Sequence, residues 1–253
     1  MDSSTSSTTS PSPSPSALVQ TLNQKGVYCI TTGRCNRAIS FFVRAMEVSK
    51  QDQHRTACNC EHCSLEACIE YSHSLVQEHS ESAMEEDDSC DFVRQFCNRE
   101  DSSSHNHDDD GYLYRIPIVT KPDSMGHSMG NIMPKILTFN LALAHHLKAL
   151  DEKQNNFKIA VRLYQLVYQT ELKEKSKASF FFALVAANNL ADVHRRLSNP
   201  QKQQQCLQFV LSAIMLMGYD ISSRNREYCK VELDGFVRNA TSLILTPGCA
   251  AVA

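Results

Sequence analysis

Four cysteines stand close together in the sequence and are the residue types best suited to chemistry. They fall within eleven positions: Cys58, Cys60, Cys63 and Cys68. Thiolates are the soft donors that tetrahedral zinc prefers. Zinc modules usually pair two widely separated ligand couples, however, and this crowded spacing matches no established signature. A zinc-binding module built on these four cysteines is therefore an alternative to free, partly buried thiols.

Histidines offer a second possible chemistry, but their surroundings argue against it. His145 and His146 are adjacent on a predicted helix, so they point in different directions, and neither has a carboxylate or cysteine at helical spacing. His105, His107 and the aspartates at 108–110 have the composition of a solvated loop. The motifs GxGxxG, GxxxxGKS, HExxH and GxSxG are absent. We therefore predict a protein that is not an enzyme and has no bound cofactor.

Composition indicates a globular, intracellular protein. The chain has 253 residues, of which 42% are hydrophobic, enough to bury a sizeable core. Its first basic residue is Lys25, so it lacks the pattern of a secretory signal. The longest apolar run, residues 178–187, is about half of the roughly 20 residues that a membrane span needs. Eleven cysteines, an odd count, indicate free thiols in a reducing compartment, so we expect a cytoplasmic or nuclear location and no membrane contact.

Charge is distributed unevenly along the chain. Residues 78–110 hold 12 acidic side chains against Arg94 and Arg99, whereas residues 134–230 hold 14 basic and 7 acidic side chains. The acidic segment could therefore fold over the basic helical part and compete with an acidic partner. The basic part has no interleaved aromatic pattern for stacking bases, so we expect no nucleic-acid partner.

Composition shifts and apolar periodicity divide the chain into five parts. The predicted divisions are a disordered Ser/Thr/Pro tail (1–16), a helical hairpin (17–50), a Cys-rich and then acidic, largely disordered insertion (51–111), an extended linker (112–130) and a helical stack with a terminal capping helix (131–253). Within the insertion, residues 64–79 could form a short helix. Residues 112–120 alternate aromatic and β-branched side chains, and Pro117 restricts them to an edge strand or an irregular extended segment. In the stack we expect helices at 131–150, 157–174, 177–197, 201–217 and 231–245.

The first hairpin has the small and large residues that close helix packing requires. Gly26 is the close-contact position of its first helix, and Gly33 falls in the turn. Ala38, Phe42 and Ala45 then place an aromatic ring between two small residues on the second helix. Such a ridge fits against a partner helix whose contact point is a glycine.

This spacing resembles the tetratricopeptide repeat (TPR), a helix-turn-helix unit that stacks into a superhelix. The first unit carries the resemblance through Leu22, Gly26, Gly33, Ala38, Phe42 and Ala45. Further units can be laid over residues 136–169 and 185–211. The stretches FNLALAHHLKAL and ELDGFVRN are also similar to uncharacterised repeat proteins of diatoms. The resemblance implies an all-α fold of antiparallel hairpins stacked as a TPR-like superhelix, interrupted by the acidic insertion.

The resemblance also implies a concave groove that holds an extended peptide. Aligning the first helices of the units places these residues on or near the groove: Asn23, Asn140, His146, Asn189, Asp192, Arg195 and Arg196. Asparagine can both donate to and accept from a backbone amide, which suits peptide binding. Asn140 and Asn189 could equally satisfy turns within the stack. We predict a scaffold that binds a protein or peptide partner, whose identity and oligomeric state the sequence leaves open.

Overall fold

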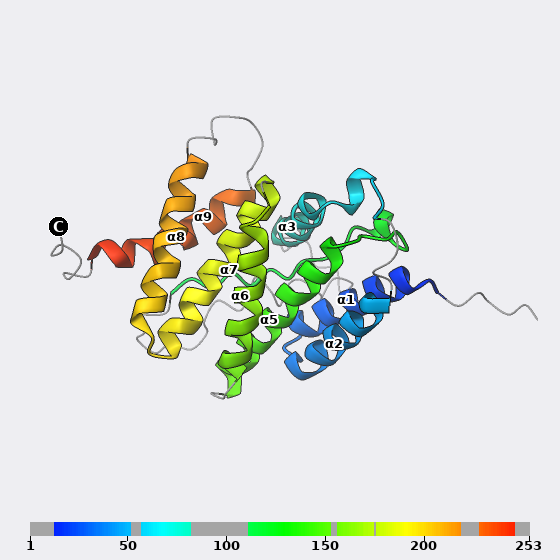
Figure 1. Cartoon of the computed structure of the whole chain (residues 1–253), viewed down its shortest axis with the longest axis horizontal. Coiled ribbons are helices and arrows are strands. Elements are labelled where there is room, and N and C mark those ends of the chain that lie inside the picture. The colour runs from blue at the N-terminus through cyan, green and yellow to red at the C-terminus, as the bar shows by residue number, and fades with distance from the viewer. Residues whose placement is uncertain are drawn as a thin grey trace, which may run out of the picture.

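The computed structural model describes residues 13–51, 57–81, 111–152, 156–174, 176–218 and 228–245. Within these ranges the protein is all-helical and has no strand, which confirms the all-α prediction (Figure 1). The α-helices in chain order are α1 (Pro15–Thr31), α2 (Cys35–Gln51), α3 (Leu65–Glu81), α5 (Ile132–Glu152), α6 (Asn156–Glu171), α7 (Lys177–Arg196), α8 (Pro200–Gly218) and α9 (Tyr228–Leu245). Two short 3-10 helices are η1 (Glu61–Cys63) and η3 (Pro122–Ser124).

Local sequence signals fix where several of these helices begin. The Ser14 hydroxyl accepts a hydrogen bond from the Ala17 N–H at 3.2 Å, and Pro15 occupies the first turn of α1, where its missing N–H costs nothing. Ser176 caps α7 in the same way, accepting from the Ser179 N–H at 3.0 Å. Because Ser14 and Pro15 already belong to the start of α1, the helical part begins slightly before the predicted boundary at residue 17.

The first hairpin packs as its small residues predict. A Cβ added at Gly26 would lie 2.4 Å from Cε1 of Phe42, so only glycine allows this contact between α1 and α2. Gly33 forms the turn with φ 71°, a conformation that glycine adopts without strain. Ala38, Phe42 and Ala45 are fully buried.

Successive helices of the stack pack against one another in chain order. Helix α2 packs directly on α5, and α5, α6, α7, α8 and α9 then each pack on the next (Figure 1). The first hairpin is therefore part of the same stack as the later helices, although residues 52–131 separate them in sequence. The regular superhelix that the sequence suggested is a finer arrangement and stays a prediction.

An extended segment and one further helix lie across this stack. Residues 111–121 have no regular secondary structure, which agrees with the irregular alternative predicted from Pro117. Helix α3 packs on α7, and it also binds the segment: the Ser72 hydroxyl accepts from the Val119 N–H at 2.8 Å. The segment therefore lies between the stack and α3.

Some predictions concern residues outside the described ranges. The N-terminal part of the predicted Ser/Thr/Pro tail and most of the acidic segment, including His105 and His107, lie there. None of the helices in the described ranges combines the length and apolar character that crossing a bilayer requires.

Candidate functional site

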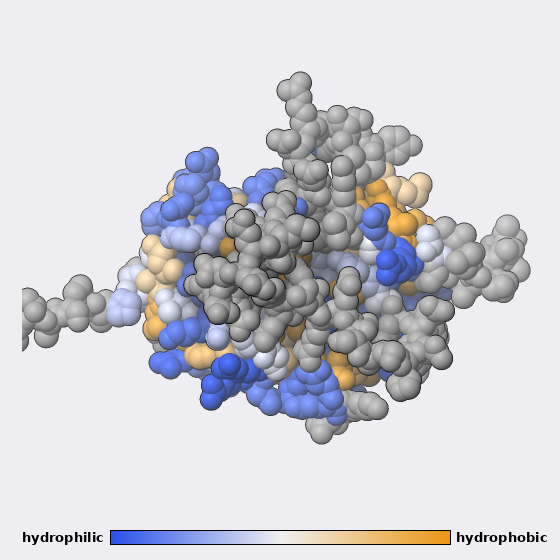
Figure 2. All heavy atoms as spheres, turned by 180° about the vertical axis from the view of Figure 1, so that it is seen from behind, coloured by the Kyte–Doolittle hydropathy of each residue, from blue (hydrophilic) through white to orange (hydrophobic). Residues whose placement is uncertain are grey.

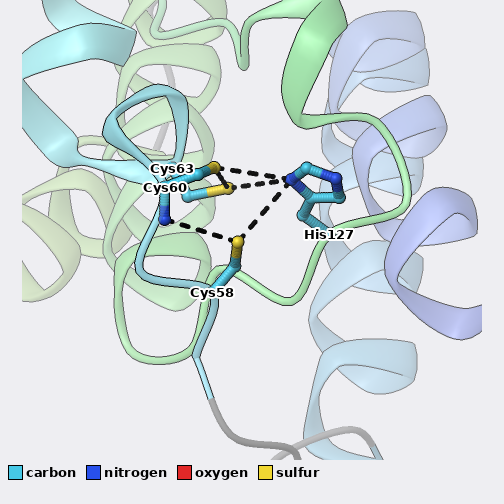
Figure 3. A group of neighbouring side chains, drawn as sticks. All are labelled: Cys58, Cys60, Cys63 and His127. Carbon is cyan, nitrogen blue, oxygen red and sulfur yellow. Dashed lines mark hydrogen bonds between the residues drawn. The ribbon is translucent and has the colours of Figure 1, made fainter.

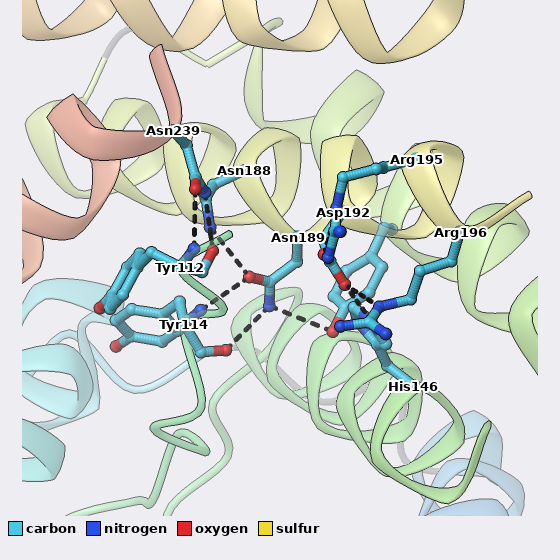
Figure 4. Close-up of polar contacts among 10 residues, drawn as sticks. Tyr112, Tyr114, His146, Asn188, Asn189, Asp192, Arg195, Arg196 and Asn239 are labelled. Atoms are coloured by element: carbon cyan, nitrogen blue, oxygen red, sulfur yellow. Dashed lines mark hydrogen bonds and ion pairs between the residues drawn. The ribbon is translucent and has the colours of Figure 1, made fainter. Parts of the chain in front are cut away.

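Asparagine side chains from several helices bind the backbone of the extended segment (Figure 4). Asn140 accepts from the Ile118 N–H at 2.8 Å and donates to the Ile118 carbonyl at 2.8 Å. Asn189 accepts from the Tyr114 N–H at 3.0 Å and donates to the Tyr114 carbonyl at 2.9 Å. In each pair one amide satisfies both backbone groups of one residue.

Asparagines at both ends of the stack also bind the segment. Asn239 accepts from the Tyr112 N–H at 2.7 Å and donates to its carbonyl at 2.7 Å, and Asn23 donates to the Ile118 carbonyl at 3.1 Å. We call these four residues the asparagine ladder: Asn23 of α1, Asn140 of α5, Asn189 of α7 and Asn239 of α9. All four are buried, so the hydrogen bonds to the segment replace those that water would otherwise make.

Tyr114 anchors the segment inside the protein. It is fully buried, and its ring stacks on Phe236 and meets the edges or faces of Phe139 and Phe181. Its hydroxyl lies 3.0 Å from Nε2 of His73 on α3. The segment is therefore a structural part of the core as well as the occupant of the ladder.

A second polar cluster surrounds Asp192 on α7 (Figure 4). Its carboxylate lies 3.0 Å from Nε2 of His146, 2.7 Å from Arg195 and 2.8 Å from Arg196. Burial raises the pKa of Asp192, but these hydrogen bonds and charges outweigh it and hold the pKa well below its usual range. Burial lowers the pKa of His146 despite its bond to Asp192, and the two arginines place positive charge beside the carboxylate.

The predicted groove residues thus divide into two groups. Asn23, Asn140 and Asn189 do bind an extended backbone, but in this structure it belongs to the chain itself. The remaining four form the cluster around Asp192, whose carboxylate is bonded by His146, Arg195 and Arg196. Binding of a separate peptide by either group stays a prediction. The sequence alone did not predict Asn188 and Asn239, which also bind the Tyr112 carbonyl. The position of Asn239 close to the apolar residues Phe236 and Ala240 could have indicated that it is buried.

Three of the four predicted cysteines lie together beside a histidine that was not predicted (Figure 3). Nδ1 of His127 is 3.7, 3.5 and 3.6 Å from the sulfurs of Cys58, Cys60 and Cys63, respectively. All four donor atoms lie within 4.8 Å of one another, close enough to bind one metal ion. We call these residues the Cys/His cluster. Among the described residues it is the one group of three or more histidine, cysteine and carboxylate side chains placed in this way.

Cys68 does not belong to the Cys/His cluster, which corrects the predicted ligand set. It is fully buried on α3, five positions after Cys63, and burial raises the pKa of its thiol to about 12. Its sulfur is not among the four donor atoms that lie within 4.8 Å of one another. His127 takes its place from a loop, 64 positions after Cys63 in the chain. Only tertiary structure could pair the two, because no local spacing connects them.

The thiols of the cluster have opposed tendencies to ionise. Hydrogen bonds from Cys63, His127 and Cys58 lower the pKa of Cys60 to about 6. Burial, together with the neighbouring thiols, raises the pKa of Cys63.

One protein family matches part of the chain. The model of the RNA-dependent RNA polymerase (RdRP) head domain matches residues 123–213, just over a third of the sequence. The match covers α5, α6, α7 and most of α8, and it contains His127, Asn140 and Asn189 but none of the clustered cysteines. No curated protein and no solved structure matches the chain.

This match corrects three predictions. The resemblance to TPR proteins is wrong, because the matching family is the RdRP head domain. The small-residue spacing that suggested it reflects the close Gly26–Phe42 contact, which any tight antiparallel hairpin can use. The prediction that the chain is not an enzyme is also overturned, since the matching domain belongs to an enzyme family, although it covers only part of the chain. The description of the chain as a TPR scaffold falls with the first correction.

Proposed function

We propose that this chain is a helical scaffold that holds extended polypeptide on its asparagine ladder and binds a protein partner. One observation carries the proposal. Asn140, Asn189 and Asn239, on three different helices, each donate to and accept from the backbone of a single residue. A surface of this kind recognises an extended backbone whatever its side chains are.

Selectivity for particular sequences would come from the side-chain pockets. The pocket of Tyr114 combines the rings of Phe139, Phe181 and Phe236 with a polar partner, His73, for the hydroxyl. Such a pocket favours tyrosine, because a phenol hydroxyl can bond Nε2 of the buried imidazole and an apolar ring cannot. The preferred ligand is therefore an extended strand with a tyrosine that fills this pocket.

In this structure the occupant is the chain's own segment, so a partner strand must compete with it. An intramolecular ligand acts at an effective concentration of about millimolar or more. A free peptide can therefore displace the segment only when the segment itself is weakened. Substituting Tyr114 provides this weakening, because it removes the ring that fills the pocket.

A peptide-rescue experiment tests the proposal. Tyr114→Ala should lower the melting temperature, and a synthetic peptide of residues 112–120 should restore part of it in a concentration-dependent way. The same peptide should not rescue Tyr114→Ala combined with Asn189→Ala, whereas Tyr114→Ala combined with Asn36→Ala should be rescued, since Asn36 is an exposed residue of α2. If no peptide concentration up to about millimolar raises the melting temperature, the ladder serves only its own segment.

A partner that does not bind the asparagine ladder could contact hydrophobic side chains on the outer surface instead. Large hydrophobic side chains are exposed on the second helices of the hairpins, among them Val43, Leu166, Met215 and Leu216. On the opposite side of the molecule, orange and blue areas lie side by side over the coloured part of the surface (Figure 2). Met215 and Leu216 are neighbours on α8 and are the most exposed of these side chains.

A second candidate function is a link to an RNA-dependent RNA polymerase, which the family match over residues 123–213 favours. The matched helices are the continuous central part of the stack. Immunoprecipitation of the natural protein, followed by an assay for RNA-templated nucleotide incorporation, tests this link. Incorporation that depends on the template and on the precipitated chain would support it, and incorporation no higher than in a mock precipitate would oppose it.

A further inference from the structure

We propose that Cys58, Cys60, Cys63 and His127 bind one Zn²⁺ ion in a closed tetrahedral site. Three thiolates and one imidazole form a donor set that zinc uses in structural sites. Soft sulfur ligands disfavour magnesium and calcium, which prefer oxygen. The site lies apart from the asparagine ladder and does not depend on it.

The separations between the three sulfurs and the histidine nitrogen fit this geometry. With Zn–S near 2.3 Å and Zn–N near 2.0–2.1 Å, a tetrahedron places sulfur and nitrogen about 3.5–3.6 Å apart. The three observed sulfur to Nδ1 distances are 3.7, 3.5 and 3.6 Å. The sulfurs of Cys60 and Cys63 are 3.2 Å apart, against about 3.8 Å in a zinc site. That distance is also far longer than the roughly 2.05 Å of a disulfide.

Hydrogen bonds outside the cluster hold the ligands in position. The Cys58 N–H donates to the Ser128 carbonyl at 2.7 Å, which joins the cysteine loop directly to the histidine loop. Gln20 of α1 accepts from the Gly126 N–H at 2.7 Å and donates to the Ser124 and His127 carbonyls at 2.9 and 3.2 Å. Gly126 allows this turn with φ 82°. The loops are thus oriented by contacts that need no metal, as the supporting residues of metal ligands commonly are.

The arrangement indicates a structural role for the ion. All four tetrahedral positions are taken by protein ligands, so none is left for a substrate or an activated water. The ion would join the residues just before α3 to the loop that follows the extended segment (Figure 3). Since α3 and the segment together cover the ladder, zinc would fasten the two ends of this covering part to each other.

Metal analysis of the purified chain tests the site. Wild-type protein should contain about one zinc per chain. Cobalt substitution should give the intense visible absorption of a tetrahedral thiolate site. His127→Ala and Cys60→Ser should each weaken zinc binding by about 100-fold or more, because losing a ligand costs more than the 10–100-fold typical of a supporting residue. Cys68→Ser and Cys206→Ser are matched controls and should keep full zinc content, since both thiols lie outside the cluster.

Several outcomes would overturn the site. Wild-type protein that gains no zinc when refolded with the ion, and whose Cys58, Cys60 and Cys63 thiols react equally with and without it, has no such site. Equal zinc content in wild type and in folded His127→Ala would remove His127 from the ligand set and contradict the proposal, as would loss of zinc from Cys68→Ser. If His127→Ala does not fold, competition of wild-type protein with a chromogenic chelator still measures the affinity. No peptide enters this experiment, so its failure leaves the ladder proposal standing.

Discussion

Asn189 binds both backbone groups of Tyr114, a residue 75 positions earlier in the chain, at 3.0 and 2.9 Å. This one side chain joins α7 to the extended segment and also donates to the Tyr164 hydroxyl at 3.2 Å. Asn189, Tyr114 and Tyr164 are all buried, so water cannot replace a lost hydrogen bond. The consequences of this and three other contacts can be measured.

Asn189→Ala should destabilise the fold by about 2–4 kcal/mol, because it leaves a buried N–H and a buried carbonyl unpaired. Chemical denaturation followed by circular dichroism measures the loss. Asn36→Ala changes an exposed asparagine of α2 and should alter stability by no more than about 0.5 kcal/mol. Equal effects of the two substitutions would contradict a ladder that holds the segment.

Gly26→Ala should destabilise the first hairpin by about 1–3 kcal/mol, since the new methyl group would overlap the Phe42 ring. Thermal unfolding of the variant provides the test. Combining it with Phe42→Leu should be less damaging than the sum of the two single changes, because the smaller side chain leaves room for the methyl. Strict additivity would show that the two residues are not in contact.

Asp192→Asn should destabilise the protein near neutral pH by about 1–3 kcal/mol, a value reduced because Arg195 and Arg196 are partly exposed. The pKa of Asp192 is lowered in the folded state, so its ionised form contributes stability above the unfolded pKa, near 4. This contribution is lost as the pH falls from there toward the folded pKa.

Unfolding measured from pH 7 to pH 3 should therefore show the wild type and Asp192→Asn converging in acid. Asp151→Asn is the matched control, because Asp151 is exposed. A difference between wild type and Asp192→Asn that stays constant over this range would contradict the assigned ionisation.

Gln20→Ala should weaken zinc binding by about 10–100-fold without removing a ligand, because Gln20 orients the loop that carries His127. Chelator competition measures the affinity. Thr21→Ala is the control on the same helix, since the Thr21 hydroxyl bonds only the Ala17 carbonyl of its own helix among the described contacts. Unchanged zinc affinity in Gln20→Ala would show that the loop needs no support from α1.

The sequence by itself determined the helices and the first hairpin contact. Apolar residues recurring at helical spacing, ended by Gly33 and by the 198–200 turn, are local signals, so most helix bounds could be predicted to within a few residues. The contact of Gly26 with Phe42 could also be predicted, because the hairpin that creates it spans few residues. Pro117, which has no N–H to give to a sheet, limited residues 112–120 to an edge strand or an irregular segment, and the structure has the second.

Only the tertiary structure decided what these helices hold. Asparagines that suit peptide binding were visible in sequence, but their partner lies 22 to 127 positions away, and no local pattern specifies it. The fourth member of the Cys/His cluster was hidden for the same reason: His127 reaches the cysteines through a loop that Gln20 of α1 positions. Periodicity reports which face of a helix is buried, whereas the identity of the group buried against it depends on how the whole chain folds back on itself.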